Sequence, residues 1–319
     1  MIFSWQTQQW EQLCRLKNEK RLPHALLLTG PAGIGKRQLA LAFASLVLCQ
    51  NGKPLTARCG NCRACYLMQA ESHPDFHLIQ PEQAGQAIKI DPIRELSEGI
   101  HQTTHQGGFR VVIIQPATAM NTSAANALLK TLEEPAPHTL LILISDHRTS
   151  LPITVASRCQ QLRFGLPSRE AALSWLRLQE QSVAWEPILE ATQGAPLMAY
   201  SWHQEGIWLL YHRFMNDLLA LTRQETDPFH LAVQWKETDL LWIVDLFFQW
   251  LLKLIRFQQC SDQTEALPIL LPDRRSNNVL WGFVDYLQRL RAEALGPYNL
   301  NQQLMLESLF IRWVQYVSG

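Results

Sequence analysis

The stretch "HALLLTGPAGIGKR", residues 24–37, decides the fold of this chain. Its apolar first half is typical of a buried strand, its glycine-rich second half forms a loop, and apolar residues recur at helical spacing after it. The loop fits the phosphate-binding pattern GxxxxGK[ST] at Gly30, Gly35 and Lys36, but Arg37 stands where the pattern has Ser or Thr. The order of strand, loop and helix predicts a phosphate-binding loop; a plain glycine-rich turn is the alternative.

The candidate phosphate-binding residues are Gly30, Gly33, Gly35 and Lys36. Glycines let backbone N–H groups turn towards a phosphate, the start of the following helix adds positive charge, and the lysine can reach the outer phosphate oxygens. Hydrolysis needs more than this cradle. Magnesium must also be held by a loop Ser or Thr and by an acid at the end of a neighbouring strand.

Both magnesium ligands are missing from the sequence. Arg37 occupies the loop position, and Gln115 and Pro116 follow the apolar run 111–114 where an acid is expected. Loss of a catalytic metal removes several kcal/mol of transition-state stabilisation. We therefore expect no intrinsic ATPase activity and no tight ATP binding by a vestigial loop, although Arg37 could also replace the lost cation.

The overall composition gives no sign of a membrane or nucleic-acid protein. Lys plus Arg and Asp plus Glu both number 28, so bulk charge draws the chain to neither DNA nor anionic lipid. The most apolar segment, residues 239–257, is interrupted by Asp245, Gln249 and Lys253, which favours a core helix over a membrane span. Because the N-terminus lacks a secretory signal pattern, we expect a cytoplasmic protein without membrane contact.

Strand-like runs alternate with helical patterns in the first half of the chain, which predicts an α/β fold with a parallel five-stranded sheet. The five predicted buried strands are residues 24–29, 75–80, 110–115, 139–145 and 160–164. Asp91 is expected to cap the N-terminus of a helix, with Pro92 at its first position.

The strand signal stops near residue 165, and the rest of the chain is helical in pattern. Pro167 and Ser168 are interpreted as a linker and a helix cap. We therefore predict a phosphate-loop domain over residues 1–165, a small helical lid domain over 166–206 and an all-α domain over 207–319.

Four of the seven cysteines lie close together in the sequence: Cys49, Cys59, Cys62 and Cys65. Four thiolates can enclose a tetrahedral structural Zn²⁺, which would hold together an insertion at about residues 49–75. His73 is a substitute ligand if Cys49 points away. An iron–sulfur cluster and four free thiols are the alternatives, although no Cys-Pro follows the cluster.

Two further motifs indicate a family. "ANALLKTLEEP" at residues 125–135 and "SRC" at residues 157–159, together with the cysteine insertion and the degenerate loop, resemble the delta-prime subunits of bacterial DNA polymerase III clamp loaders, which are AAA+ proteins. The resemblance is strongest over residues 22–165. Beyond them, only helical character and length agree.

The resemblance implies a subunit of a five-membered ring that opens the sliding clamp and places it on primed DNA. Its partners would be the gamma/tau and delta subunits, with the clamp and primer-template DNA reached through the complex. The arginine of the SRC motif would act as an arginine finger in the ATP site of a neighbouring subunit, and Arg158 matches it. The C-terminal helices would form the collar that fastens the subunits together.

Two positions depart from the active members of that family. Ser145 matches a phosphate-sensing position but has no metal site to serve, and Leu197 and Met198 occupy the region of a second sensor arginine. Both departures favour a subunit that does not hydrolyse ATP. The alternatives are an active remodelling or helicase-loading ATPase that uses Lys36 with an atypical metal site, and a DNA-binding zinc module with basic residues beside its cysteines.

Overall fold

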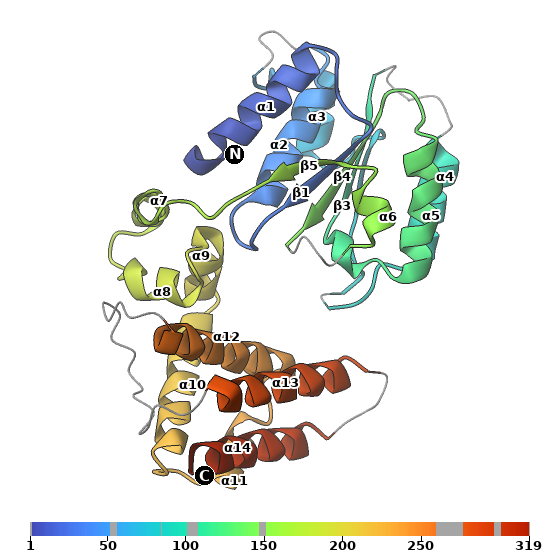
Figure 1. The fold of residues 1–319 in the computed structure, drawn as a ribbon. Helices are drawn as coiled ribbons and strands as arrows, with labels where there is room; N and C mark the ends of the chain where they lie inside the picture. Colours follow the sequence, from blue (N-terminus) through green and yellow to red (C-terminus); the bar gives the residue numbers. More distant parts are fainter. Residues whose placement is uncertain are drawn as a thin grey trace. The chain divides into compact units, whose positions relative to one another are not determined.

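The computed structural model describes residues 2–51, 56–83, 85–100, 108–146, 151–259, 277–296 and 301–318. The chain divides into two compact units, Met1–Ile207 and Trp208–Gly319. Helices and strands are labelled in Figure 1. The further division of the first unit into a sheet domain and a lid domain remains a prediction.

A parallel sheet forms the centre of the first unit. Its strands are β1 (Ala25–Thr29), β2 (Phe76–Ile79), β3 (Arg110–Ile114), β4 (Thr139–Ser145) and β5 (Gln160–Arg163). They lie in the order β2-β3-β4-β1-β5, and every neighbouring pair is parallel, which confirms the predicted five-stranded sheet. The prediction that all five are buried is wrong for β2 and β5, because each is an edge strand with one neighbour and partly exposed residues.

Helices cover both faces of this sheet. The longer ones are α1 (Thr7–Asn18), α2 (Lys36–Leu48), α4 (Ile90–Ile100) and α5 (Thr122–Glu133). The short ones are η1 (Ser4–Gln6), α3 (Arg63–Gln69), η2 (Ala117–Ala119) and α6 (Ile153–Ala156). Figure 1 shows α1 and α2 on one face and α4 and α5 on the other.

The alternation of side chains along the strands separates two hydrophobic cores. In β1, Leu26 and Leu28 point to one face and pack in a core with Phe43 of α2. Leu27 points to the opposite face and packs in a second core with Leu128 of α5. Because both faces are covered, the central strands read as continuous apolar runs in the sequence.

Three helices complete the first unit: α7 (Arg169–Gln179), α8 (Trp185–Ala191) and α9 (Pro196–Gln204). The predicted cap at Ser168 is confirmed, because its side chain accepts a hydrogen bond from the backbone N–H of Ala171. The predicted cap at Asp91 is wrong. Helix α4 already begins at Ile90, so this carboxylate lies in the first turn, where it still faces the positive end of the helix.

The second unit is entirely helical among its described residues. It contains α10 (Ile207–Thr222), α11 (Pro228–Trp235), α12 (Leu240–Gln259), α13 (Asn277–Ala294) and α14 (Gln302–Ser318). Trp313 is fully buried at its centre, with ring centroids of Trp250, Phe247 and Phe283 between 5.0 and 5.2 Å away. Its indole N–H donates to the Thr222 hydroxyl at 2.9 Å, so the polar atom of this buried ring is satisfied.

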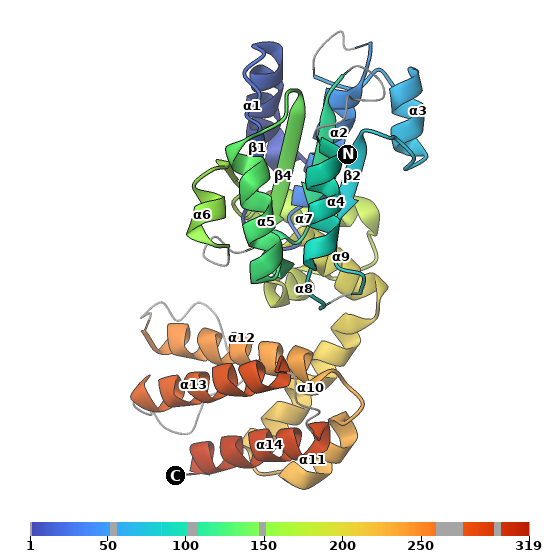
Figure 2. The same ribbon diagram turned by 90° about the vertical axis from the view of Figure 1, so that its right-hand side faces the viewer.

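The long apolar segment of the sequence forms α12, which packs against α13 (Figure 2). Ile243, Phe247 and Leu251 of α12 are fully buried, which confirms the predicted core helix. Among the described residues, none of the helices combines the length and apolarity that crossing a bilayer requires.

Leu128→Ala should destabilise the chain by about 2–5 kcal/mol, because it removes a fully buried side chain and leaves a cavity between α5 and the sheet. The matched control is Leu178→Ala on α7, whose side chain is 80% exposed and whose removal should change stability by less than about 0.5 kcal/mol. Urea unfolding followed by circular dichroism measures both. Equal effects of the two substitutions would contradict the assigned core.

Candidate functional site

The glycine-rich loop lies between the end of β1 and the start of α2, as the sequence predicts. Gly33 and Gly35 have φ values of 71° and 91°, a region that favours glycine. A Cβ at Gly33 would come within 2.6 Å of the Met198 side chain, and one at Gly35 within 2.6 Å of the Phe3 ring. The glycines are therefore required here by close contacts with other parts of the same chain.

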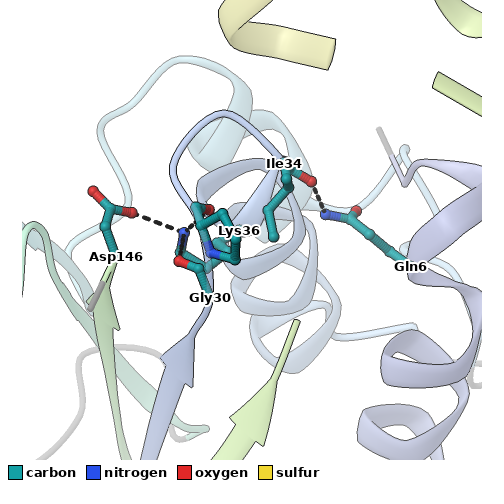
Figure 3. A network of polar contacts seen from close by, with 6 residues as sticks. Gln6, Gly30, Ile34, Lys36 and Asp146 are labelled. Atoms are coloured by element: carbon teal, nitrogen blue, oxygen red, sulfur yellow. Dashed lines mark hydrogen bonds and ion pairs between the residues drawn. The ribbon is translucent and has the colours of Figure 1, made fainter. Parts of the chain in front are cut away.

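The ammonium group of Lys36 is fully engaged by acceptors of its own chain. It donates to the carbonyl oxygens of Gly30 at 2.7 Å and Pro31 at 2.5 Å, and to the carboxylate of Asp146 at 2.8 Å (Figure 3). A lysine ammonium has three N–H donors, so these three contacts use them all. The side chain is only 4% exposed, and its charge is balanced by the Asp146 carboxylate, which comes from outside the loop.

Asp146 is a residue of this site that the sequence analysis did not predict. The acid was expected at the end of β3, where Gln115 stands instead. The structure brings an acid from β4, the strand between β3 and β1. Strand β4 pairs in parallel with β1, with Ser145 opposite Thr29. The residue after β4 therefore lies beside the loop after β1, and the adjacency of Asp146 to the fourth predicted strand was the available signal.

Space remains beside this ion pair. A cavity of about 350 Å³ is lined in part by Lys36, Arg37, Gln115, Asp146 and Met198. Arg37 and Gln115, the residues that replace the two expected magnesium ligands, thus do lie together at the site. Neither supplies an oxygen anion, so Asp146 is the carboxylate in this lining, and it is paired with Lys36.

The outer side of the loop is covered by the N-terminal segment. The indole N–H of Trp5 and the side-chain amide of Gln6 both donate to the carbonyl oxygen of Ile34, at 2.9 and 3.0 Å. Gln6 is fully buried, and the Phe3 ring stacks on Trp5 with centroids 4.8 Å apart. The N-terminal residues therefore hold the loop through the carbonyl oxygen of Ile34.

Helices α7 and α9 reach the same loop. The backbone N–H of Leu197 donates to the carbonyl oxygen of Gly33 at 2.9 Å, and the Met198 side chain lies against that glycine. Trp175 of α7 makes edge contacts with the rings of Phe3 and Trp5. The structure thus places Leu197 and Met198 beside the loop, where the resemblance locates a second sensor, and gives this position an apolar packing role.

The four predicted metal ligands come together. The sulfur atoms of Cys49, Cys59, Cys62 and Cys65 all lie within 4.8 Å of one another, and two pairs are 3.9 Å apart. A tetrahedral zinc site with Zn–S bonds of about 2.3 Å has sulfur atoms about 3.8 Å apart. The cluster therefore fits a four-thiolate metal site. His73 is not one of the clustered groups, and its Nδ1 instead accepts from the backbone N–H of Asp75.

The surroundings shift the pKa values of two thiols of the cluster in opposite directions. Burial acts to raise the pKa of Cys62, but hydrogen bonds from the backbone N–H groups of Cys65 and Gln50 outweigh it and lower that pKa to about 6. The backbone N–H of Cys59 likewise donates to the sulfur of Cys49 at 3.4 Å. For Cys65, burial dominates and raises the pKa to about 12.

Arg158 lies just after α6, at the end of one helical turn. Its Nη1 donates to the carbonyl oxygen of Thr154 at 2.9 Å, and its Nη2 donates to the carboxylate of Glu133 at 2.6 Å. The side chain is 37% exposed. In the part of the chain that the structure describes, no hydrogen bond or ion pair joins Arg158 to the phosphate loop, so the two predicted sites are separate.

Comparison with known proteins agrees with this arrangement. A family model described as "DNA polymerase III, delta subunit" matches residues 5–167, and one described as "DNA polymerase III, delta subunit, C terminal" matches residues 205–315. The DNA polymerase III subunit delta′ of Pseudomonas aeruginosa is 37% identical, over 98% of this chain and 97% of that protein. That of Haemophilus influenzae is 31% identical, over 96% and 94%.

A more distant relative is the DNA polymerase III subunit tau of Bacillus subtilis, 31% identical over 64% of this chain and 36% of that protein. The delta′ matches extend over nearly the whole length of both proteins, whereas the tau match does not. We conclude that the chain belongs to the delta-prime family of DNA polymerase III subunits.

Proposed function

We propose that this chain is a non-hydrolysing subunit of a DNA polymerase III clamp loader and that it supplies Arg158 in trans to the ATP site of a neighbouring subunit. Its partners are the gamma/tau and delta subunits, and it helps to load the sliding clamp on primer-template DNA through the assembled complex. The observation that carries this proposal is the state of Lys36, whose three donors and single charge are satisfied within its own chain.

The engaged lysine explains why the chain should not bind a triphosphate tightly. Phosphate oxygens that approach Lys36 would have to displace the Asp146 carboxylate, which lies 2.8 Å from the ammonium nitrogen, or come close to it. Because phosphate and carboxylate are both negatively charged, they repel each other. The described lining of the cavity holds no second carboxylate beside Asp146, so magnesium would find only neutral oxygens there, such as the Gln115 amide, and would offset little of that repulsion. The retained glycines then serve packing contacts with Phe3 and Met198 instead of a ligand.

The arginine, in contrast, is partly exposed and suited to act on another molecule. A guanidinium keeps its charge at any physiological pH and offers a planar array of N–H donors to phosphate oxygens. Such a group supplied to a neighbouring site is worth roughly 10³–10⁵ in rate. Arg158 lies just after the short helix α6. Cys159 and Leu162, which follow it in the chain, are buried, so the backbone at Arg158 is firmly placed.

The active-ATPase alternative gains one observation, which is the presence of Asp146. A carboxylate at the end of β4 can in principle bind magnesium. Here the Asp146 carboxylate is paired with Lys36. The last position of the loop pattern, where Ser or Thr supplies a hydroxyl, is Arg37 in this chain. One carboxylate that is shared with a lysine makes a poor magnesium site, so the non-hydrolysing function fits the geometry better.

We further propose that the cysteine cluster holds a structural Zn²⁺. The group has four sulfur ligands with tetrahedral spacing and no open position, which is the arrangement of structural and not of catalytic zinc. The ion would connect the end of α2, which precedes Cys49, to the start of α3, which follows Cys62. Its contribution would be to the folding of the insertion.

The purified chain should neither hydrolyse ATP nor bind it at micromolar concentrations, because Lys36 is already neutralised. Asp146→Ala should free the ammonium and strengthen binding of a fluorescent ATP analogue by about tenfold, the effect of removing one adjacent like charge. It should not create hydrolysis. Fluorescence titration and phosphate release measure the two properties. ATP hydrolysis by the unmodified chain that Lys36→Ala abolishes would instead establish the active-ATPase alternative.

Arg158→Ala should lower single-turnover ATP hydrolysis at the neighbouring site about 10³-fold or more in a reconstituted clamp loader, because the developing phosphate charge loses its guanidinium partner. The other ATP sites would be silenced by substituting their own loop lysines. Arg163→Ala, an exposed residue on β5, is the matched control and should leave the rate unchanged. An unaltered rate in the Arg158 variant would refute the finger.

Purified chain should contain about one zinc ion, and Cys65→Ser should lose it, because three thiolates and a hydroxyl make a much weaker site. The melting temperature should fall by several degrees on this substitution or on chelation. Elemental analysis and thermal unfolding measure these effects. Cys159→Ser is the control, since this buried cysteine lies outside the cluster. Iron with visible absorbance, or no metal at all, would contradict the zinc site.

A further inference from the structure

We propose that Glu133 is a positioning residue for Arg158, an inference that rests on the proposed arginine finger. The two sequence motifs that indicate the family, residues 125–135 and residues 157–159, meet in the structure through this pair. Nη2 of Arg158 donates to Oε1 of Glu133 at 2.6 Å. No other ion pair involving Arg158 occurs among the residues that the structure describes.

Glu133 is a well-anchored partner because it is the last residue of α5. Leu128 and Leu132 of this helix are buried in the core under the sheet, and the hydroxyl of Thr131 lies 3.0 Å from that of Ser97 on α4. The glutamate side chain at the end of the helix projects outwards, with 52% of it exposed. The carboxylate is therefore offered from a rigid element to a residue 25 positions later in the chain.

The backbone of Arg158 is held just as firmly. Its N–H donates to the carbonyl oxygen of Val155 at 3.2 Å, and both Val155 and Cys159 are buried. Nη1 of its guanidinium donates to the carbonyl oxygen of Thr154. With the backbone fixed and two terminal nitrogens each held by one acceptor, the plane of the guanidinium is set before any neighbouring subunit arrives.

The pairing leaves the guanidinium able to act. Arginine has five N–H donors, and the two contacts use one on each terminal nitrogen, so three donors remain for phosphate oxygens. A free arginine side chain loses much rotational freedom when it is ordered by a ligand. Glu133 removes part of that freedom in advance, which is preorganisation of a catalytic group by a residue that does not touch the substrate.

The alternative role of Glu133 is that of a competitor that must release Arg158 before phosphate is bound. That role would fit a guanidinium whose donors were all occupied or whose side chain was buried. Neither holds, since three donors are left and the side chain is 37% exposed. The two roles predict opposite changes in rate, so one measurement separates them.

Neighbouring Glu134 offers a matched control. It is also exposed and carries the same charge, but it lies beyond the end of α5 with φ of −121°, and no ion pair with Arg158 forms. Long-range electrostatic effects of removing a carboxylate are thus shared by the two positions, whereas the direct contact is not.

The test uses the complete clamp loader, with single-turnover ATP hydrolysis measured at the neighbouring site alone. Glu133→Ala should lower the rate constant about fivefold, the upper range for an exposed ion pair, with the apparent affinity for ATP unchanged. Glu133→Gln, which keeps an acceptor oxygen, should recover part of the loss. Glu134→Ala should match the unmodified complex, and ring assembly and the melting temperature should be the same for all variants.

The same substitution in an Arg158→Ala background separates the possible failures. If Glu133 acts through Arg158, Glu133→Ala should cause no further loss there. A rate that is unchanged or raised by Glu133→Ala and Glu133→Gln, or an equal loss in both backgrounds, would overturn the positioning role while leaving the finger intact. If Arg158→Ala itself has no effect, the proposed function fails, and this inference fails with it.

Discussion

The ammonium group of Lys36, held by two loop carbonyls and by Asp146, is the contact on which the rest of the first unit depends. Because Asp146 balances the charge of Lys36, the ammonium group can donate to carbonyl oxygens of its own loop and hold the loop in a compact conformation. Other parts of the chain then bind to this loop. The carbonyl oxygen of Gly33 then binds the backbone of α9, and that of Ile34 binds the N-terminal segment. The glycine-rich loop thus joins three parts of one compact unit.

The sequence predicted what depends on local pattern. The apolar runs predicted all five strands, with ends that differ from the observed ends by about one residue at most. Ser168 correctly predicted the start of a helix, because capping depends on residues close in the sequence. The cysteine cluster was predicted for a similar reason. A CxxCxxC spacing places three sulfur atoms within reach of one ion, and Cys49 needed only to end α2 on the same side.

What the sequence did not predict depends on which strands are neighbours and in what register. Asp146 meets Lys36 across 110 positions because β4 lies next to β1 with Ser145 opposite Thr29. Glu133 meets Arg158 because α5 and α6 pack on the same face of the sheet. The exposed edges of β2 and β5 were missed likewise, since an apolar run does not reveal how many neighbours a strand has.

The two carboxylate–cation pairs show how one kind of contact can have opposite consequences. Asp146 meets an ammonium that has three donors, all of them used, on a side chain that is 4% exposed. Glu133 meets a guanidinium that keeps three of five donors, on a side chain that is 37% exposed. The first pair uses every donor of its cation, whereas the second leaves three donors of its cation unused. Under the proposed function, the number of unused donors, more than the strength of either pair, would decide which cation can act on a phosphate.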